Sequence, residues 1–264
     1  MNHDAVVVIP AKNAAKFLEE SVTSVINQKT SFDFGIYIVN DHSSDLTSQI
    51  AKDMVARYKN IQVIESHGSG ISDALNTGIQ LANCSYIIRH DADDIMLEGR
   101  IQNQLELLSL ETQYVVVGGQ IEPFGVNQLP TVNRYPLSDR EIRRFSLFGN
   151  PFAHPTTSFR LDAVKTVGMY RSEWNGAEDY DLWLRLLRIG KGVNLPQLVT
   201  QYRVHPGQVT NTNSIKVNSQ TLRLQLKNMG YLIHNRQFAS GVVCGLAVIT
   251  KFTRNLIRRV LHWI

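Results

Sequence analysis

Short apolar runs alternate with segments of helical periodicity over the first 110 residues. Apolar runs bounded by polar residues predict strands, which lie at residues 5–10, 34–40, 61–65 and 85–90. Apolar positions spaced three or four apart, such as Leu18, Val22 and Val25, predict helices between these strands. The helical segments lie at residues 18–26, 43–58 and 70–82. Strands alternating with helices are typical of parallel βαβ units, so the pattern predicts an α/β fold with a doubly wound sheet.

The pattern is less regular after residue 110. Further elements are predicted at residues 113–125 (one or two strands), 136–149 (a short helix), 149–160 (a loop leading into a strand) and 177–190 (a helix). The last of these is the clearest, because Leu182, Leu186 and Ile189 share one helical face and Gly190 follows them. We find no internal repeat and no low-complexity segment. With 264 residues, the chain is long enough for a single large α/β core or for such a core with an appendage.

The C-terminal segment has a different character. One helical stripe is formed by Leu222, Leu226, Met229 and Ile233. The uncharged run 238–250 follows, which is shorter than the roughly 20 residues of a membrane-spanning helix. Beyond it, apolar residues on one helical face oppose basic residues on the other: Phe252, Leu256, Val260 and Trp263 against Lys251, Arg254 and Arg258. This pattern predicts a basic, amphipathic helical extension of the kind that lies in a membrane interface.

Charge is divided unevenly along the chain. Residues 1–181 hold 15 of the 27 Lys and Arg residues and all 23 Asp and Glu residues, whereas residues 182–264 hold the other 12 basic residues and no acidic one. Such asymmetry suggests either that the basic end meets an anionic surface or that it is a solvated basic face without a partner. Together with the amphipathic pattern, it favours an anionic membrane surface. A helix packed on the protein's own core or on a second subunit, as in a homodimer, is the alternative. No nucleic-acid partner is expected.

Three carboxylates, Asp91, Asp93 and Asp94, directly follow the apolar strand at residues 85–90. Charges so close to a buried segment are costly unless positive charge compensates them. Open parallel sheets bind ligands beyond the carboxyl ends of their strands, where this cluster lies. Mg²⁺ and Mn²⁺ prefer oxygen ligands, so the cluster indicates a divalent-cation site. A solvated turn with helix-capping aspartates is the other interpretation.

Seven motifs, taken together and in order, resemble the family 2 glycosyltransferases, inverting enzymes of bacterial type with the GT-A fold. They are VVVIPAKNAAKFLEESVTSVINQ, IVNDHSSDLT, GISDALNTGI, RHDADDIM, GNPFAHPTTSFR, AEDYDLWLRL and QYRVH. The resemblance implies a Rossmann-like, doubly wound, mostly parallel mixed sheet. It implies a GT-A domain at 1–206, with a nucleotide-binding half (1–110) and an acceptor-binding half (111–206). The helical, basic, membrane-associating tail at 207–264 lies outside the resemblance and is predicted from its residue pattern alone.

The resemblance also implies a donor site for a UDP-sugar. Its residues would be Pro10, Ala11, Asn13, Asp41, Ser72, Ala74 and Asn76. Asp41 matches the aspartate that accepts a hydrogen bond from the uracil ring, a role that suits a carboxylate. The chain departs from the family pattern at Asn40, His42 and Leu75, where an aspartate, a glycine and a basic residue are more frequent.

Asp91 and Asp93 match the family's DxD motif. The resemblance implies that Asp93 ligates Mn²⁺ or Mg²⁺ directly, while Asp91 shares the metal and lies nearer the ribose and the diphosphate. His205 would reach the metal or the diphosphate, and Arg203 would contact a phosphate. The metal would act as a Lewis acid on the departing nucleoside diphosphate.

Asp179 matches the family's catalytic base, which removes the proton of the acceptor hydroxyl. Glu178 points about 100° around the same helix and would lie on the acceptor side, together with His154. The structural alternative is that Glu178 and Asp179, with Asp181, stabilise the positive end of the helix dipole.

These features predict a metal-dependent, inverting glycosyltransferase that moves a hexose or an N-acetylhexosamine from a UDP-sugar to a saccharide. The basic tail favours a lipid-linked acceptor, as in O-antigen or capsule synthesis at the inner face of the bacterial inner membrane. Two cysteines and the absence of a signal-peptide pattern favour a peripheral, cytoplasmic location. A sugar-phosphate nucleotidyltransferase and a non-catalytic, membrane-bound nucleotide-sugar-binding protein are the alternatives.

Overall fold

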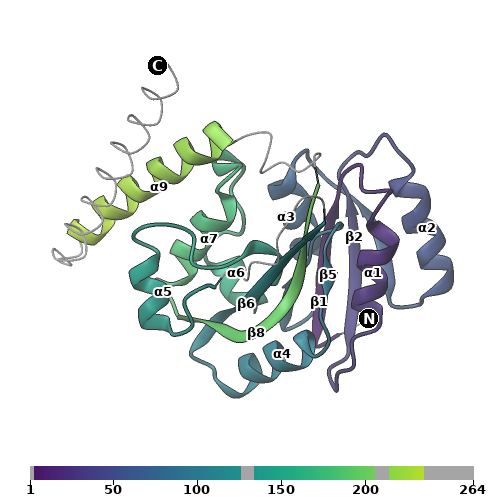
Figure 1. Ribbon diagram of the computed structural model, residues 1–264, viewed down its shortest axis with the longest axis horizontal. Coiled ribbons are helices and arrows are strands. Elements are labelled where there is room, and N and C mark those ends of the chain that lie inside the picture. The colour runs from purple at the N-terminus through teal and green to yellow at the C-terminus, as the bar shows by residue number, and fades with distance from the viewer. Residues whose placement is uncertain (1–2, 126–133, 206–213, 235–264) are drawn as a thin grey trace.

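The computed structural model describes residues 3–125, 134–205 and 214–234 (Figure 1). Its strands are β1 (Ala5–Ala11), β2 (Phe34–Asn40), β3 (Ile61–Glu65), β4 (Tyr86–Arg89), β5 (Ile95–Met96), β6 (Tyr114–Gly125), β7 (Ser158–Arg160) and β8 (Lys191–Val204). They form one sheet in the order β3-β2-β1-β4-β7-β6-β8-β5. The four strands predicted in the first 110 residues are confirmed, and they pair in parallel, as βαβ units require.

The second half of the sheet is mixed. Strand β7 runs antiparallel to both β4 and β6, while β6 and β8 are parallel to each other. Because two reversals cancel, β8 runs in the same direction as β4. The end of β8 therefore lies at the same edge of the sheet as the end of β4, which brings residues after Val204 close to the acidic segment after Arg89.

Helices cover both faces of the sheet (Figure 1). They are α1 (Leu18–Ile26), α2 (Thr47–Arg57), α3 (Ile71–Leu81), α4 (Arg100–Leu110), α5 (Asp139–Phe145), α6 (Leu161–Thr166), α7 (Glu178–Leu186) and α9 (Ser214–His234). Alternate residues of β1 point into two apolar layers. Val7 and Ile9 pack with α1, α2 and α4, and Val6 and Val8 pack with α3, α6 and α7.

Several elements differ from the sequence prediction. The helix predicted at 177–190 ends at Leu186, and the one predicted at 43–58 begins at Thr47. Strand β8 and helices α4 and α6 were not predicted. The side chains of β8 do not follow a simple alternation of buried and exposed positions, since bulges shift its register against β6.

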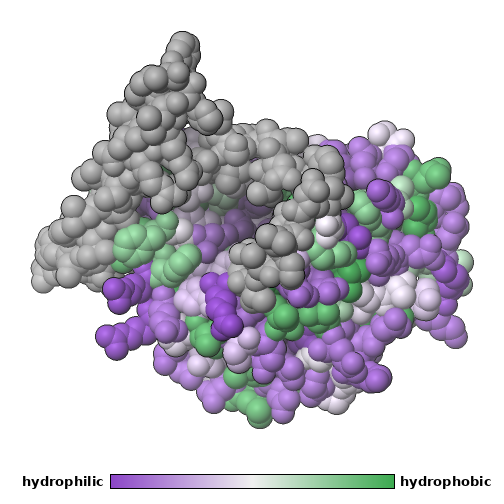
Figure 2. Space-filling view, in the orientation of Figure 1, coloured by the Kyte–Doolittle hydropathy of each residue, from purple (hydrophilic) through white to green (hydrophobic). Residues whose placement is uncertain are grey.

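The described part of the C-terminal segment is the long helix α9, as predicted. Its buried residues are Leu224, Gln225 and Asn228, whereas Leu226 is 44% exposed. The predicted apolar stripe is thus not the face that packs on the protein. The run 238–250 and the amphipathic segment after it lie outside the described residues. On the face shown in Figure 2, hydrophilic residues predominate and apolar ones occur in small groups. No helix within the described ranges is both long and apolar enough to cross a bilayer.

Candidate active site

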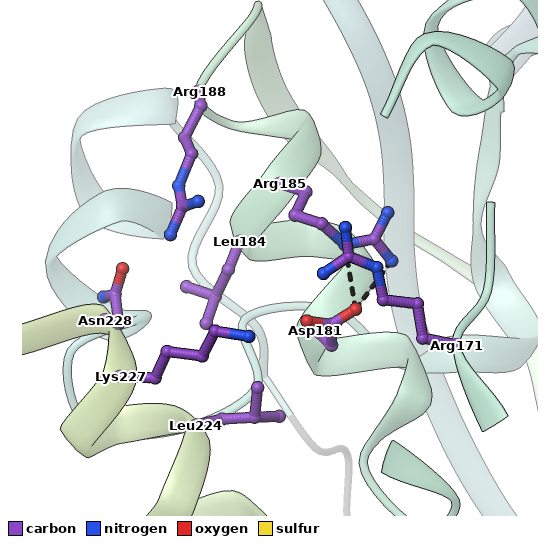
Figure 3. Close-up of a pocket in the computed structure, with 8 residues that line it drawn as sticks. All are labelled: Arg171, Asp181, Leu184, Arg185, Arg188, Leu224, Lys227 and Asn228. Atoms are coloured by element: carbon purple, nitrogen blue, oxygen red, sulfur yellow. Dashed lines mark hydrogen bonds and ion pairs between the residues drawn. The ribbon is translucent and has the colours of Figure 1, made fainter. Parts of the chain in front are cut away.

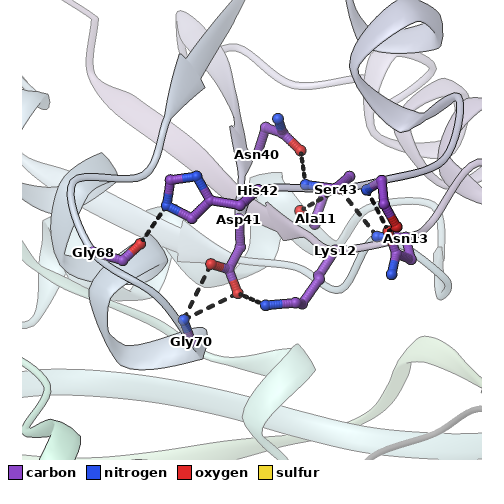
Figure 4. A network of polar contacts seen from close by, with 10 residues as sticks. Ala11, Lys12, Asn13, Asn40, Asp41, His42, Ser43, Gly68 and Gly70 are labelled. Atoms are coloured by element: carbon purple, nitrogen blue, oxygen red, sulfur yellow. Dashed lines mark hydrogen bonds and ion pairs between the residues drawn. The ribbon is translucent and has the colours of Figure 1, made fainter.

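A polar network surrounds Asp41 at the ends of β1 and β2 (Figure 4). The buried carboxylate of Asp41 accepts hydrogen bonds from Lys12 Nζ at 3.1 Å and from the Gly70 N–H at 3.0 Å. Its own N–H donates to the Ala11 carbonyl at 2.8 Å. The loop after β1, the loop after β2 and the start of α3 therefore meet at one carboxylate. Lys12 is a contact that the sequence analysis did not single out.

Two residues of this network adopt left-handed backbone conformations. Asn13 and His42 both have φ of 51°. Asparagine tolerates this region because its side chain bonds locally, and Asn13 Oδ1 accepts from the Ser44 N–H at 2.8 Å. His42 instead lies 3.0 Å, through Nε2, from the Gly68 carbonyl. A positive φ explains why glycine is frequent in the family at the position of His42.

The three α3 residues predicted for the donor site contact other parts of the protein. Ser72 Oγ donates to Asn175 Oδ1 at 2.9 Å. Both ends of the Asn76 amide bond to the backbone of Tyr170, at 2.9 and 3.0 Å. Ala74 is fully buried in the apolar core. These contacts hold α3 against the segment that leads into α7, and donor contacts of the three residues stay a prediction.

The three aspartates after β4 converge. Oxygen atoms of Asp91, Asp93 and Asp94 lie within 4.8 Å of one another. Asp94 is fully buried, and its Oδ1 accepts from the Arg203 N–H at 2.8 Å, whereas its Oδ2 has no partner among the described residues. A buried oxygen without a partner is costly, and a divalent cation would satisfy it. The arrangement therefore fits a metal ion, with Asp94 as a third candidate ligand.

Basic side chains hold this acidic cluster from several strands. Arg89 Nη2 lies 2.5 Å from Asp91 Oδ1. Arg203 Nε donates to the Asp93 carbonyl at 2.6 Å, and His205 Nε2 lies 2.9 Å from Asp93 Oδ2. The predicted pair Arg203 and His205 is thus placed beside the DxD segment. Arg89 was missed, although an arginine inside an apolar strand is itself a signal for a charged partner.

Burial and mutual repulsion raise the pKa of two carboxylates in this cluster. Burial, followed by the charges of Asp91 and Asp93, raises the pKa of Asp94 well above its usual value. Burial also raises the pKa of Asp91, although Arg89 opposes this shift. A cation bound among these groups would remove the repulsion between them.

A second acidic pair begins α7. Asp179 Oδ2 accepts from Asn150 Nδ2 at 2.5 Å, and its Oδ1 accepts from the Tyr180 N–H at 2.7 Å. Glu178 Oε2 accepts from the Gly176 N–H at 2.6 Å. Burial, with a contribution from the charge of Asp179, raises the pKa of Glu178 to about 7. Burial also raises the pKa of Asp179. Both carboxylates are consequently better bases than exposed ones.

His154 lies on the same side of the sheet as this pair. Its Nε2 is 2.9 Å from the Tyr170 hydroxyl, and its ring lies edge-on to Trp183. Burial and the charge of Arg89 lower the pKa of His154 well below its usual value, which makes the imidazole neutral. Because it is neutral, His154 can position an uncharged group through hydrogen bonds but carries no positive charge that would stabilise an anion.

A model of the family described as glycosyl transferase family 2 matches residues 6–168. This chain belongs to glycosyl transferase family 2. The match extends over more than half of the chain and includes the Asp41 network and the DxD cluster. Membership makes the protein a glycosyltransferase rather than a sugar-phosphate nucleotidyltransferase.

Curated relatives act in polysaccharide synthesis. The amylovoran biosynthesis glycosyltransferase AmsE of Erwinia amylovora is 28% identical, over 84% of this chain and 85% of that protein. The UDP-Gal:alpha-D-GlcNAc-diphosphoundecaprenol beta-1,3-galactosyltransferase of Escherichia coli is also 28% identical, over 81% of this chain and 78% of that protein. The glycosyltransferase thus has relatives named for amylovoran biosynthesis and for O-antigen biosynthesis.

Solved structures share the fold. S. aureus TarS 1–349 in complex with UDP-GlcNAc superposes with a TM-score of 0.68 at 17% identity, covering 86% of this chain but 66% of that one, less than two thirds of its length. The mannosyltransferase PcManGT from Pyrobaculum calidifontis, in complex with GDP-Man and Mn²⁺, gives a TM-score of 0.67 at 14% identity and covers 100% of this chain and 81% of that one. The predicted GT-A fold is confirmed.

Proposed function

We propose that this glycosyltransferase transfers a hexose or an N-acetylhexosamine from a UDP-sugar, with inversion, to a lipid-linked saccharide acceptor in cell-surface polysaccharide synthesis. Residues 1–206 would carry out the transfer, and residues 207–264 would hold the enzyme at the inner face of the inner membrane. A UDP-sugar and a diphosphoundecaprenol acceptor are named for the E. coli relative, and UDP-GlcNAc for the TarS structure, which supports this choice.

The donor would enter at the shared edge of β1, β2 and β4. Asp41, held by Lys12 and Gly70, would accept a hydrogen bond from the uracil N–H. Pro10, Ala11 and Asn13 lie in the adjoining turn and would contact the base and ribose, next to the α3 residues Ser72, Ala74 and Asn76. Arg203 is a guanidinium beside the DxD segment that suits a phosphate oxygen.

Asp91 and Asp93, with His205 beside them and Asp94 beneath, would hold Mn²⁺ or Mg²⁺, which when bound neutralises the charge of the leaving diphosphate. PcManGT was solved with Mn²⁺. The Arg89 guanidinium of β4 contacts Asp91 Oδ1 and would hold this carboxylate in place.

On the acceptor side, Asp179 would take the proton of the attacking hydroxyl. The Asn150 amide and the Tyr180 N–H fix the orientation of its carboxylate. Glu178 next to it would bind the acceptor or share the proton, since its pKa of about 7 places it near neutrality. His154, neutral and bonded to Tyr170, would line the acceptor pocket.

The observation that carries this proposal is the presence, in one chain, of a carboxylate cluster suited to a cation and a separate pair suited to a proton, in which Glu178 is buried and Asp179 half-buried. The test is to incubate the full chain with Mn²⁺, a panel of labelled UDP-sugars and a lipid-linked acceptor. We expect UDP release with one or two sugars and a product of inverted anomeric configuration. UDP-sugar binding without any transfer would instead support the non-catalytic, nucleotide-sugar-binding alternative.

A further inference from the structure

Half of the side chains that line a pocket between α7 and α9 are basic (Figure 3). Its lining residues are Arg171, Asp181, Leu184, Arg185, Arg188, Leu224, Lys227 and Asn228. The acid in this set, Asp181, is paired with Arg185, whose Nε and Nη2 lie 2.8 and 2.7 Å from its Oδ2. The other three basic residues leave the lining with an excess of positive charge.

The basic groups are crowded together. Arg185 is buried and fixed, since it also donates to the carbonyls of Val167 and Met169. Burial lowers the pKa of Arg185; Asp181 opposes this shift, and the charges of Arg171 and Arg188 add to it. Figure 3 shows Arg171 next to Arg185, with Arg188 and Lys227 extending from the other side. Like charges at such positions repel, and an anion between them would relieve the repulsion.

The pocket depends on the docking of α9 against the helix that carries the acidic pair. Leu224 packs into a small apolar cluster with Trp174, Ala177, Tyr180 and Leu184. Lys227 Nζ lies 5.2 Å from the centre of the Trp174 ring, which fixes the amine near the pocket. Because Ala177 directly precedes the acidic pair, the pocket and that pair are attached to the same short element.

The opposite side of α9 is apolar. Leu222, Leu226 and Met229 lie on one stripe, about half a turn away from the buried Leu224. Leu226 is 44% exposed, and the other two are half-buried. Because the stripe and the pocket lie on opposite sides of α9, an anionic group held in the pocket could reach Leu226 only through a long, flexible hydrocarbon chain that passes around the helix.

We propose that this pocket binds the diphosphate of a lipid-linked acceptor, with the hydrocarbon chain directed along the Leu222–Met229 stripe. The inference rests on the proposed function and adds to it a specific acceptor-binding site. Holding the diphosphate at α9 would place the attached sugar towards the first turn of α7, which carries Asp179. Recognition would then depend on Arg171, Arg188 and Lys227.

The test measures binding of the full-length chain to phosphatidylcholine vesicles that contain either a polyprenyl diphosphate or phosphatidylglycerol at equal surface charge. We expect tighter binding to the diphosphate vesicles. The triple variant Arg171→Gln/Arg188→Gln/Lys227→Gln should bind them roughly a hundredfold more weakly, because each surface cation contributes about fivefold. Lys29→Gln/Lys52→Gln/Lys59→Gln removes the same charge far from the pocket and is the matched control.

Transfer kinetics give a second readout. KM is measured for one saccharide acceptor in two forms, with and without its lipid diphosphate. The ratio of these two KM values should approach one in the triple variant. Equal binding of both vesicle types by the wild type, or equal weakening by the control variant, would overturn the proposal, because the chain would then respond to bulk charge. Diphosphate-specific binding without transfer from any UDP-sugar would support the pocket and overturn the proposed function instead. Thermal melting of each variant confirms that it is folded.

Discussion

Two acidic clusters lie in this glycosyltransferase, and their surroundings differ. Around Asp91, Asp93 and Asp94, the partners are charged or chargeable: Arg89 contacts Asp91, Arg203 donates twice to the segment, and His205 contacts Asp93. Burial, followed by repulsion from Asp91 and Asp93, raises the pKa of Asp94 even with these partners present. A site of this kind responds to a change in positive charge, such as the arrival of a divalent cation.

Around Glu178 and Asp179, the described hydrogen-bond partners are neutral. They are the Asn150 amide and the N–H groups of Gly176 and Tyr180. Burial is the largest cause of the raised pKa of both carboxylates. A site of this kind responds to protons. This difference in surroundings supports the proposal of a cation at the first cluster and proton transfer at the second.

The largest expected effect comes from Asp179→Asn, which keeps the shape and the hydrogen bond to Tyr180 but removes the base. We expect kcat to fall by roughly 10²–10⁴-fold, the usual contribution of a positioned base, while the Kd for the UDP-sugar changes little. Steady-state kinetics and calorimetric titration with the UDP-sugar measure the two quantities.

Asp162→Asn is the matched control for that variant. Asp162 also lies in the first turn of a helix, α6, and accepts from the next N–H in the chain, at 2.7 Å from Ala163, but it is exposed. Its kcat should stay within about twofold of the wild type. If both variants lose activity equally, the effect arises from helix capping and the proton-transfer role of Asp179 is refuted.

A second variant, Asp93→Asn, tests the other cluster. The affinity for Mn²⁺, measured by calorimetry in the absence of substrate, should weaken by roughly tenfold or more. We also expect kcat/KM to fall by about a hundredfold, because the metal contributes several kcal/mol of charge stabilisation. Chelation should inactivate the wild type, and added Mn²⁺ should restore it. Unchanged Mn²⁺ affinity in Asp93→Asn would break the proposed division between the clusters.

The sequence was sufficient to predict the parallel half of the sheet. Each of its strands is a short apolar run with a helix after it, so local periodicity determines the outcome. It did not predict β8, α4 or α6. Strand β8 is paired with β6 through register shifts and half-exposed residues, and such pairing depends on partners distant in the chain.

The candidate site was predictable only in part for the same reason. The motifs located Asp41, Asp93 and Asp179, because each is part of a short pattern. They did not reveal that Arg89 holds Asp91, or that Lys12 holds Asp41, because these contacts form only after folding. Arginines from β4 and β8 also contact the segment of the three aspartates, so part of the compensating positive charge comes from the protein itself.

Arg89 connects the two regions and offers a third, smaller effect. It is 2% exposed, contacts Asp91, and its charge lowers the pKa of both Glu178 and Asp179. Arg89→Met should destabilise the fold by roughly 3–5 kcal/mol, because a buried charge loses its partner. It should also move the acidic limb of the kcat/KM profile to higher pH.

Arg89→Lys is the companion variant, since it keeps the charge and alters the geometry. We expect its acidic limb to stay closer to the wild type than that of Arg89→Met. Urea denaturation gives the stability change, and kcat/KM measured from pH 5 to 9 gives the limb. An identical limb in both variants and the wild type would mean that Arg89 acts on the DxD cluster alone.

The smallest expected effect concerns stability and sharpens the assignment of the neutral-partner pair. The pKa of Glu178 is raised from 4.5 to about 7 in the folded protein, so the folded state holds this proton more tightly than the unfolded state. The stabilisation is complete below pH 4.5 and is lost as pH rises through about 7. Glu178→Gln keeps an acceptor for the Gly176 N–H but does not titrate. Its free energy of unfolding, measured in urea between pH 5 and 8, should therefore vary less with pH and exceed that of the wild type at pH 8.

The exposed Glu173→Gln is the control and should follow the wild type. Parallel curves for all three proteins would show that Glu178 is ionised at neutral pH, and the contrast between a cation-responsive and a proton-responsive cluster would then rest on Asp179 alone.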